Sequence, residues 1–162
     1  YSAPQRPNLF RPSVDVLPPF NGRIKMIVPV QDGFFVDDGS LSFVSFSKSD
    51  DTAIIRLLPE EHSVIEGSDV LVPGYWFGLQ GTKEPVGFWW TSKGFPVIGG
   101  PGGQITPIGD KEISIPQYKV GASLLKEKNG LRQIISDFVG GGSGTSFGVS
   151  DVLTATLVTR GI

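Results

Sequence analysis

The sequence predicts a mainly β protein, an antiparallel β-sandwich or a barrel-like domain. Short apolar segments follow one another closely from Arg23 onward, and 22 Gly and 13 Pro punctuate a chain of 162 residues. Many short strands at close spacing favour an antiparallel architecture over alternating β-α-β units. The chain is 39% hydrophobic and includes 11 Phe, 3 Tyr and 3 Trp, enough to fill the core of one domain.

The first 22 residues differ from the rest of the chain. They contain five prolines and show no hydrophobic periodicity; the prolines are Pro4, Pro7, Pro12, Pro18 and Pro19. Proline fixes its own φ and biases the preceding residue toward extended conformations. We therefore expect an extended connector over residues 1–22, followed by a compact β-rich domain over residues 23–162.

The compact part reads as a series of strands and turns. After apolar segments at residues 23–30 and 33–36, Asp37-Asp38-Gly39 predicts a hairpin turn, because Gly supplies the positive φ that a tight turn needs. A strand that is at least half buried follows at residues 41–46. Further strands are predicted at residues 53–58, 70–72, 76–79, 86–91, 105–108 and 113–120, and β-branched alternation predicts a closing strand at 151–159.

One segment predicts a helix instead. Leu131, Ile134, Ile135 and Phe138 fall at positions i, i+3, i+4 and i+7, the spacing of one helical face. Asn129 is a suitable N-cap, and Gly140 would end the helix. We therefore expect one amphipathic helix over residues 129–139, packed on the face of a sheet.

Charge and composition exclude several functions. A net charge of −2 with scattered Lys and Arg argues against nucleic acid as a partner. No apolar run approaches the roughly 20 residues of a membrane-spanning helix. The absence of Cys excludes disulfides and thiolate ligands. The acidic pairs Asp37-Asp38, Asp50-Asp51 and Glu60-Glu61 lack the spacing of a Ca²⁺ loop. We expect neither a metal nor a cofactor.

His62 is the single histidine, so any Ser-His-Asp site depends on it. A hairpin with Glu66-Gly67 as its two-residue loop would place Asp69 on the same face as His62. Because side chains alternate along a strand, Ser63 would then point to the opposite face. His62 could activate Ser63 only if the backbone turned at residues 61–63. The competing interpretation is a histidine in an exposed turn.

A second serine offers an alternative nucleophile. Gly144-Thr-Ser146-Phe-Gly148 matches the G-x-S-x-G pattern, in which glycines permit a strained turn that presents the serine. In that fold a helix follows the serine, whereas here a strand is predicted, and no histidine lies downstream. A glycine-rich loop is therefore the favoured interpretation of this segment, and Ser146 stays an alternative.

The tryptophans Trp76, Trp89 and Trp90 are candidate binding residues. Adjacent residues of a strand face opposite sides, so we expect one of Trp89 and Trp90 in the core and the other at an interface, in a cleft or under a loop. An outward ring could stack on a sugar or dock a partner. Coverage by the predicted helix or by the loop at residues 99–103 is the alternative.

These features together resemble a known viral family. The proline-rich start, a compact β domain of this size with one helix, and the acidic Glu60-Glu61-His62-Ser63 turn resemble the protruding domain at the C-terminus of an iflavirus capsid protein, as found in deformed wing virus and other insect picorna-like viruses. Residues 8–20 would then be the connector from the shell. The resemblance implies assembly in the host cytoplasm, a place on the virion surface beside other capsid proteins, and contact with a host receptor or membrane lipid.

The resemblance also implies a grouped Asp, His and Ser with hydrolase-like or receptor-binding activity. Here the histidine would be His62 and the serine Ser63, with Asp69 as the favoured aspartate and Asp51 as the alternative. Two functions follow. The first is a non-enzymatic surface module that attaches to the host during entry. The alternative is a serine-dependent esterase, lipase or protease, in which Ser63 attacks an acyl carbonyl and His62 takes its proton.

Overall fold

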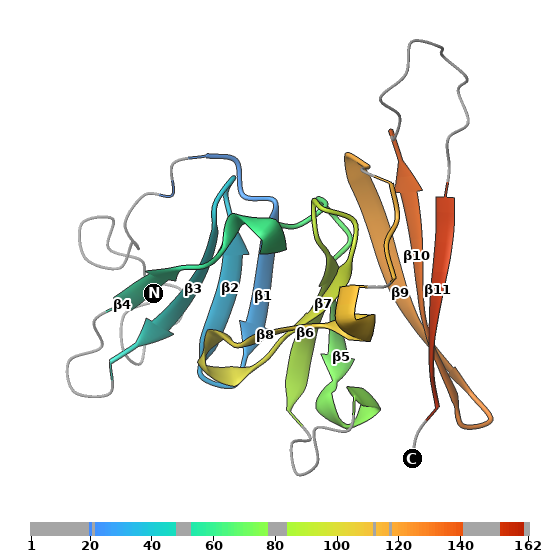
Figure 1. Cartoon of the computed structure of the whole chain (residues 1–162). Coiled ribbons are helices and arrows are strands. Elements are labelled where there is room, and N and C mark those ends of the chain that lie inside the picture. Colours follow the sequence, from blue (N-terminus) through green and yellow to red (C-terminus); the bar gives the residue numbers. More distant parts are fainter. Residues whose placement is uncertain are drawn as a thin grey trace, which may run out of the picture.

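The computed structural model describes residues 20, 22–47, 53–77, 84–111, 113–116, 118–140 and 153–160. Three open antiparallel sheets make up this part of the chain and confirm the predicted β class (Figure 1). They form three layers, where the sequence predicted a two-sheet sandwich or a barrel. Nearly all of the connector predicted for residues 1–22 lies outside the described residues.

The first sheet has the order β1-β2-β3-β4. Its strands are β1 (Met26–Val30), β2 (Gly33–Asp37), β3 (Leu41–Phe46) and β4 (Ala53–Leu57). The predicted turn between β2 and β3 is present: Gly39 has a φ of 113°, and its N–H donates to Asp37 Oδ1 at 2.8 Å. Simple up-and-down connections thus build this sheet from consecutive strands.

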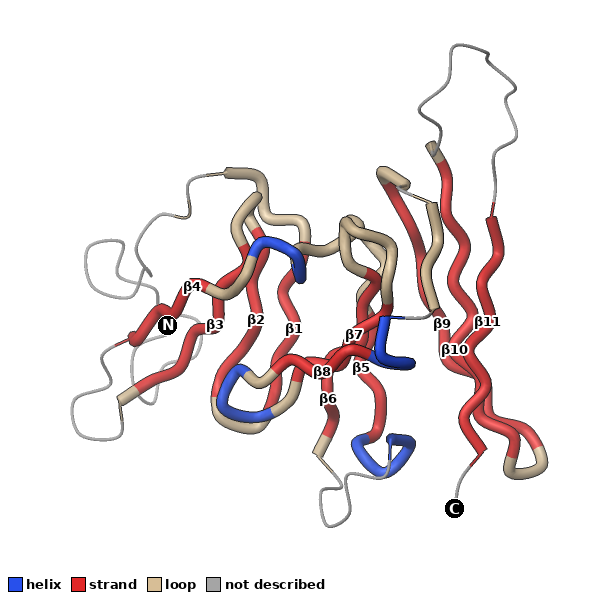
Figure 2. Tube along the Cα trace, in the orientation of Figure 1, coloured by secondary structure: helices blue, strands red, loops and turns tan. Residues whose placement is uncertain are grey.

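The central sheet has the order β5-β6-β7-β8, and short 3₁₀ turns lie before, between and after its strands (Figure 2). Its strands are β5 (Val70–Pro73), β6 (Pro85–Trp90), β7 (Pro96–Gly99) and β8 (Ile105–Pro107). The turns are η1 (Glu60–His62), η2 (Gly74–Phe77), η3 (Pro101–Gly103) and η4 (Ile108–Lys111). The strand predicted at residues 76–79 is wrong at 76–77, which belong to η2, and most of the one predicted at 113–120 is loop.

The third sheet contains β9 (Val120–Lys128), β10 (Leu131–Val139) and β11 (Leu153–Arg160), in the order β11-β10-β9. The helix predicted over residues 129–139 is therefore wrong. Asn129 and Gly130 have φ of 52° and 76°, the paired positive values of a two-residue hairpin turn, so this dipeptide joins two strands and caps no helix. Along β10, every residue pairs with β9, and all but the last also pair with β11.

The central sheet is covered on both faces. One core lies between it and the first sheet and includes Phe35, Phe43 and Trp89. A second core lies between it and the third sheet and includes Phe88, Trp90 and Phe138. The first interface is close: a Cβ on Gly99 of β7 would lie 2.7 Å from the Phe35 ring of β2. Glycine here lets the two sheets approach each other.

Candidate functional site

The segment that carries His62 leaves the first sheet in a tight turn. Pro59 enters the turn with a φ of −56°, the N–H of His62 donates to Pro59 O at 3.1 Å, and the N–H of Ser63 donates to Glu60 O at 3.0 Å. These bonds close η1. The irregular backbone that a His62–Ser63 pair would require is therefore present.

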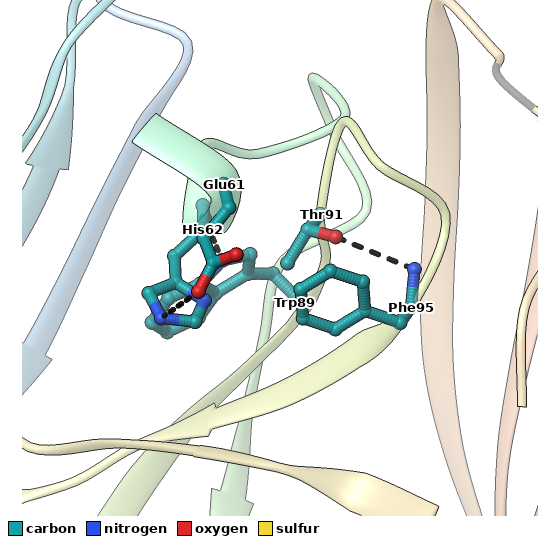
Figure 3. Close-up of polar contacts among 5 residues, drawn as sticks. All are labelled: Glu61, His62, Trp89, Thr91 and Phe95. Carbon is teal, nitrogen blue, oxygen red and sulfur yellow. Dashed lines mark hydrogen bonds and ion pairs between the residues drawn. The ribbon is translucent and has the colours of Figure 1, made fainter. Parts of the chain in front are cut away.

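His62 lies inside the protein and is only 9% exposed. Its Nε2 is 3.6 Å from Glu61 Oε1, and its ring meets Phe95 edge-on at 6.0 Å between centroids (Figure 3). The carbonyl of His62 accepts a hydrogen bond from Trp89 Nε1 at 2.8 Å. The expectation of an exposed turn histidine is wrong, because this buried indole N–H needs an acceptor and the turn supplies it.

Ser63 is also buried, and its side chain is not activated. Its Oγ makes no hydrogen bond within the described part of the chain, so His62 does not accept a proton from it in this arrangement. The Ser63 carbonyl accepts from the N–H of Ser92 at 2.6 Å, which holds the segment against the hairpin that ends β6. The two side chains are adjacent in sequence without forming a catalytic pair.

The hairpin that would place Asp69 beside His62 is not formed. A turn does occur at the expected position, where Gly67 has a φ of 81° and the N–H of Ser68 donates to Ile65 O at 3.0 Å. The flanking segments then take other partners: Val70 pairs with Phe88, and Val64 pairs with Thr91. The carboxylate near the imidazole is that of Glu61, which the sequence indicated as part of an acidic turn and not as the partner of His62. The alternatives Asp51 and Ser146 lie outside the described residues.

Asp69 is half-buried, and burial raises the pKa of its carboxyl above the ordinary value of 3.8, while a backbone hydrogen bond partly offsets the shift. The folded state thus holds the proton more tightly than the unfolded state. The free energy of unfolding must fall as the pH rises from about 3.8 through the raised pKa, and at neutral pH the ionised carboxylate destabilises the fold.

We therefore expect Asp69→Asn to be more stable than the wild type at neutral pH and to lose that advantage below the ordinary pKa of 3.8. Urea unfolding at both pH values measures the difference. Glu84→Gln, at an exposed position, serves as the control for the loss of one negative charge. An equal gain for Asp69→Asn at both pH values would show that the burial of the charged form is not the cause.

The three tryptophans do not offer rings to a ligand. Trp76, Trp89 and Trp90 are 5%, 0% and 1% exposed. Trp89 and Trp90 face opposite sides of β6, as expected, but neither lies in an open cleft, because a sheet covers each face of β6. The first sheet covers Trp89 and the third sheet covers Trp90; residues 131–139, expected as a covering helix, cover Trp90 as strand β10.

A different aromatic residue is exposed beside a cation. Tyr75 in η2 is 48% exposed, and the Arg132 guanidinium lies 4.7 Å from the centroid of its ring. Arg132 also lies 3.3 Å from Glu127 and 6.0 Å from the ring of Trp76. The sequence predicts a helix at Arg132, and no local pattern indicates that its guanidinium meets Tyr75. An exposed tyrosine with a stacked guanidinium can stack on a ligand and donate hydrogen bonds to it.

The chain has no match among models of protein families, curated proteins or solved structures. No group of three or more His, Cys, Asp or Glu in the described ranges is arranged to hold a metal ion. Among the same residues, no helix has the length and apolarity needed to cross a membrane.

Proposed function

We propose that the chain is a non-enzymatic recognition module, displayed on the surface of a virion in the manner of an iflavirus protruding domain. In this proposal the segment over residues 1–22 joins it to other capsid proteins, and its exposed surface attaches to a host receptor during entry. The observation that carries the proposal is the position of its polar and aromatic groups: Tyr75 is exposed and Arg132, stacked on its ring, is partly exposed, whereas His62 and Ser63 are buried.

Accessibility favours binding over catalysis. A serine nucleophile must reach the carbonyl of its substrate and must share its proton with a base at hydrogen-bond distance. Ser63 is only 8% exposed and its Oγ has no partner among the described residues, so both conditions would require the turn to rearrange. The ring of Tyr75 needs no rearrangement to contact a macromolecule.

Tyrosine and arginine are the residue types that most often dominate recognition surfaces. The tyrosine ring offers a rigid apolar face, and the guanidinium can bind a carboxylate or another acidic group through two parallel hydrogen bonds. Arg132 is held in place by its stacking on Tyr75 and its contact with Glu127, so little side-chain freedom is lost on binding. We propose an acidic group of a host receptor as the target of this pair.

Binding of the purified domain to the surface of insect cells, followed by flow cytometry, tests the proposal. We expect Tyr75→Ala and Arg132→Gln each to weaken binding about tenfold, the loss of about 1.4 kcal/mol that is typical of a central contact. Lys93→Gln removes an exposed cation at the turn after β6 and should bind like the wild type. Thermal unfolding confirms that each variant is folded.

Equal binding by all three variants would contradict the proposal. If the domain binds vesicles of anionic lipid and this binding depends on Tyr75, the target is the membrane and not a receptor. Treatment of the same purified domain with a fluorophosphonate probe tests the hydrolase alternative. Labelling that Ser63→Ala or His62→Ala abolishes would make hydrolysis the better proposal, and labelling that only Ser146→Ala abolishes would assign it to that serine.

A further inference from the structure

The third sheet has one face packed on the central sheet and one face turned away from it. Along β10, Ile134, Ser136 and Phe138 are buried, and the alternate positions point to the other side. This outer face, as we call it, consists of the alternate residues of all three strands. Its apolar members are Val120, Ala122, Leu124, Leu131, Ile135, Val139 and Val158.

The apolar residues of the outer face are both exposed and contiguous. Val120, Leu124, Leu131, Val139 and Val158 are 45%, 52%, 41%, 46% and 51% exposed. Register joins them: Val139 lies opposite Val120, and Ile135 lies between Leu124 and Thr156. Isolated apolar residues are common on protein surfaces, whereas a patch of this extent marks an interaction site.

The charges on the outer face restrict what can cover it. Asp137 lies one row to one side of the Leu124–Ile135 row, and Lys126 lies one row to the other side. Both side chains are exposed, and Thr154 Oγ1 donates to Asp137 Oδ1 at 2.6 Å. Lys128 lies beyond Lys126 on the same side, opposite Leu131, and is also exposed. Among the described side chains the face therefore carries its negative group on one side of the middle row and its positive groups on the other, an arrangement that is complementary to itself.

We propose that the outer face is the interface of a symmetric homodimer. The two-fold axis runs across the strands at the Leu124–Ile135 row, between the two sheets. This rotation reverses the order of the rows. The row of Asp137 in one copy therefore lies over the row of Lys126 in the other, and Val139 of one copy lies over Leu131 of the other. An axis along β10 would instead stack Asp137 on Asp137, which like-charge repulsion disfavours.

The size of the face sets the expected strength of the dimer. Strands of eight or nine residues are about 30 Å long, and three strands lie about 4.8 Å apart, so the face measures about 30 by 15 Å. This is about 450 Å² per copy, or about 900 Å² in total, below the size of standard interfaces and within the range of weak, transient ones, so we expect a dissociation constant of about 100 µM. The inference does not depend on the proposed attachment function.

Sedimentation velocity of the purified chain, over about 1 µM to 1 mM, tests for the dimer. We expect the wild type to pass from monomer to dimer in this range, and Leu124→Glu to weaken the association at least tenfold. Leu57→Glu, at an exposed leucine of the first sheet, is the matched control and should associate like the wild type. Far-UV circular dichroism confirms that each variant retains its fold.

Charge reversal tests the orientation of the two copies. Asp137→Lys and Lys126→Asp should each weaken the homodimer, and a mixture of the two single variants should associate more strongly than either alone, because every contact between copies is then of opposite charge. The double variant should recover the wild-type affinity. A wild type that is monomeric throughout the range, or a dimer that Leu124→Glu leaves intact, would overturn the proposal; so would a monomer whose outer face binds lipid vesicles instead.

Discussion

Replacing Trp90 with alanine is expected to lower the free energy of unfolding by about 4 kcal/mol, within the range measured for large aromatic residues in cores. The side chain is 1% exposed and meets the Phe138 ring edge-on at 5.5 Å, so its removal leaves a large cavity in the second core. A typical domain is stable by only about 5–15 kcal/mol, which makes this loss a large fraction of the total.

The indole of Trp90 also connects two sheets through hydrogen bonds. Its Nε1 donates to Ser136 Oγ at 3.0 Å, and Ser136 shares a 2.8 Å hydrogen bond with Ser123, whose hydroxyl donates to Ser68 O at 2.7 Å. Truncation to alanine therefore removes a donor from a buried chain of hydroxyl groups and the apolar contacts with it.

Urea unfolding, followed by circular dichroism, measures the effect. Trp90→Phe keeps most of the apolar volume and loses the N–H, so its loss should be about 1–2 kcal/mol, clearly smaller than that of Trp90→Ala. A Trp90→Ala variant within about 1 kcal/mol of the wild type would mean that the third sheet does not pack on β6 as described.

Replacing Asp37 with alanine is expected to cost about 3 kcal/mol of stability, because it removes two hydrogen bonds to a charged acceptor. Asp37 is fully buried, and its carboxylate accepts from the N–H of Val64 and of Gly39, both at 2.8 Å. The Val64 N–H is itself buried, so without Asp37 it would lose its acceptor and water could not replace it.

The matched control for Asp37 is its neighbour. Asp38 Oδ1 accepts from the exposed N–H of Ser40 at 3.2 Å, so water can replace that bond, and Asp38→Ala should cost less than about 1 kcal/mol. Chemical denaturation compares the two variants. Because Asp37 fixes the residue two positions after His62, NMR of the imidazole should also change in Asp37→Ala and not in Asp38→Ala. Equal losses of stability in both variants would contradict this role.

The fold class could be predicted because turn residues and strand length are local properties. The false helix at residues 129–139 has a specific physical cause. Ile134 and Phe138 point into the core, whereas Leu131 and Ile135 lie on the outer face. A strand that is apolar on both sides can place its hydrophobic residues at i, i+3, i+4 and i+7, and periodicity alone then cannot separate it from a helix. The Asn129-Gly130 dipeptide was the local signal that pointed to a hairpin.

The candidate site was less predictable because its geometry depends on distant partners. The alternation of side chains along a strand meant that His62 could activate Ser63 only if the backbone turned at residues 61–63. That turn is found, and Pro59 permits it. The burial of His62 depends on the Trp89 indole, 27 residues later in the chain. Likewise, the burial of both Trp89 and Trp90 depends on a third layer, which no pattern near these residues indicates.

The burial of the central sheet on both sides has a consequence for folding. Val64 belongs to one core and its neighbour Ile65 to the other, and β6 likewise contributes Trp89 to the first core and Trp90 to the second. Neither outer sheet can detach without exposing one of these shared residues to water. The two cores should therefore melt as a single cooperative unit, and the amides of β6 should exchange with solvent only when the whole domain unfolds.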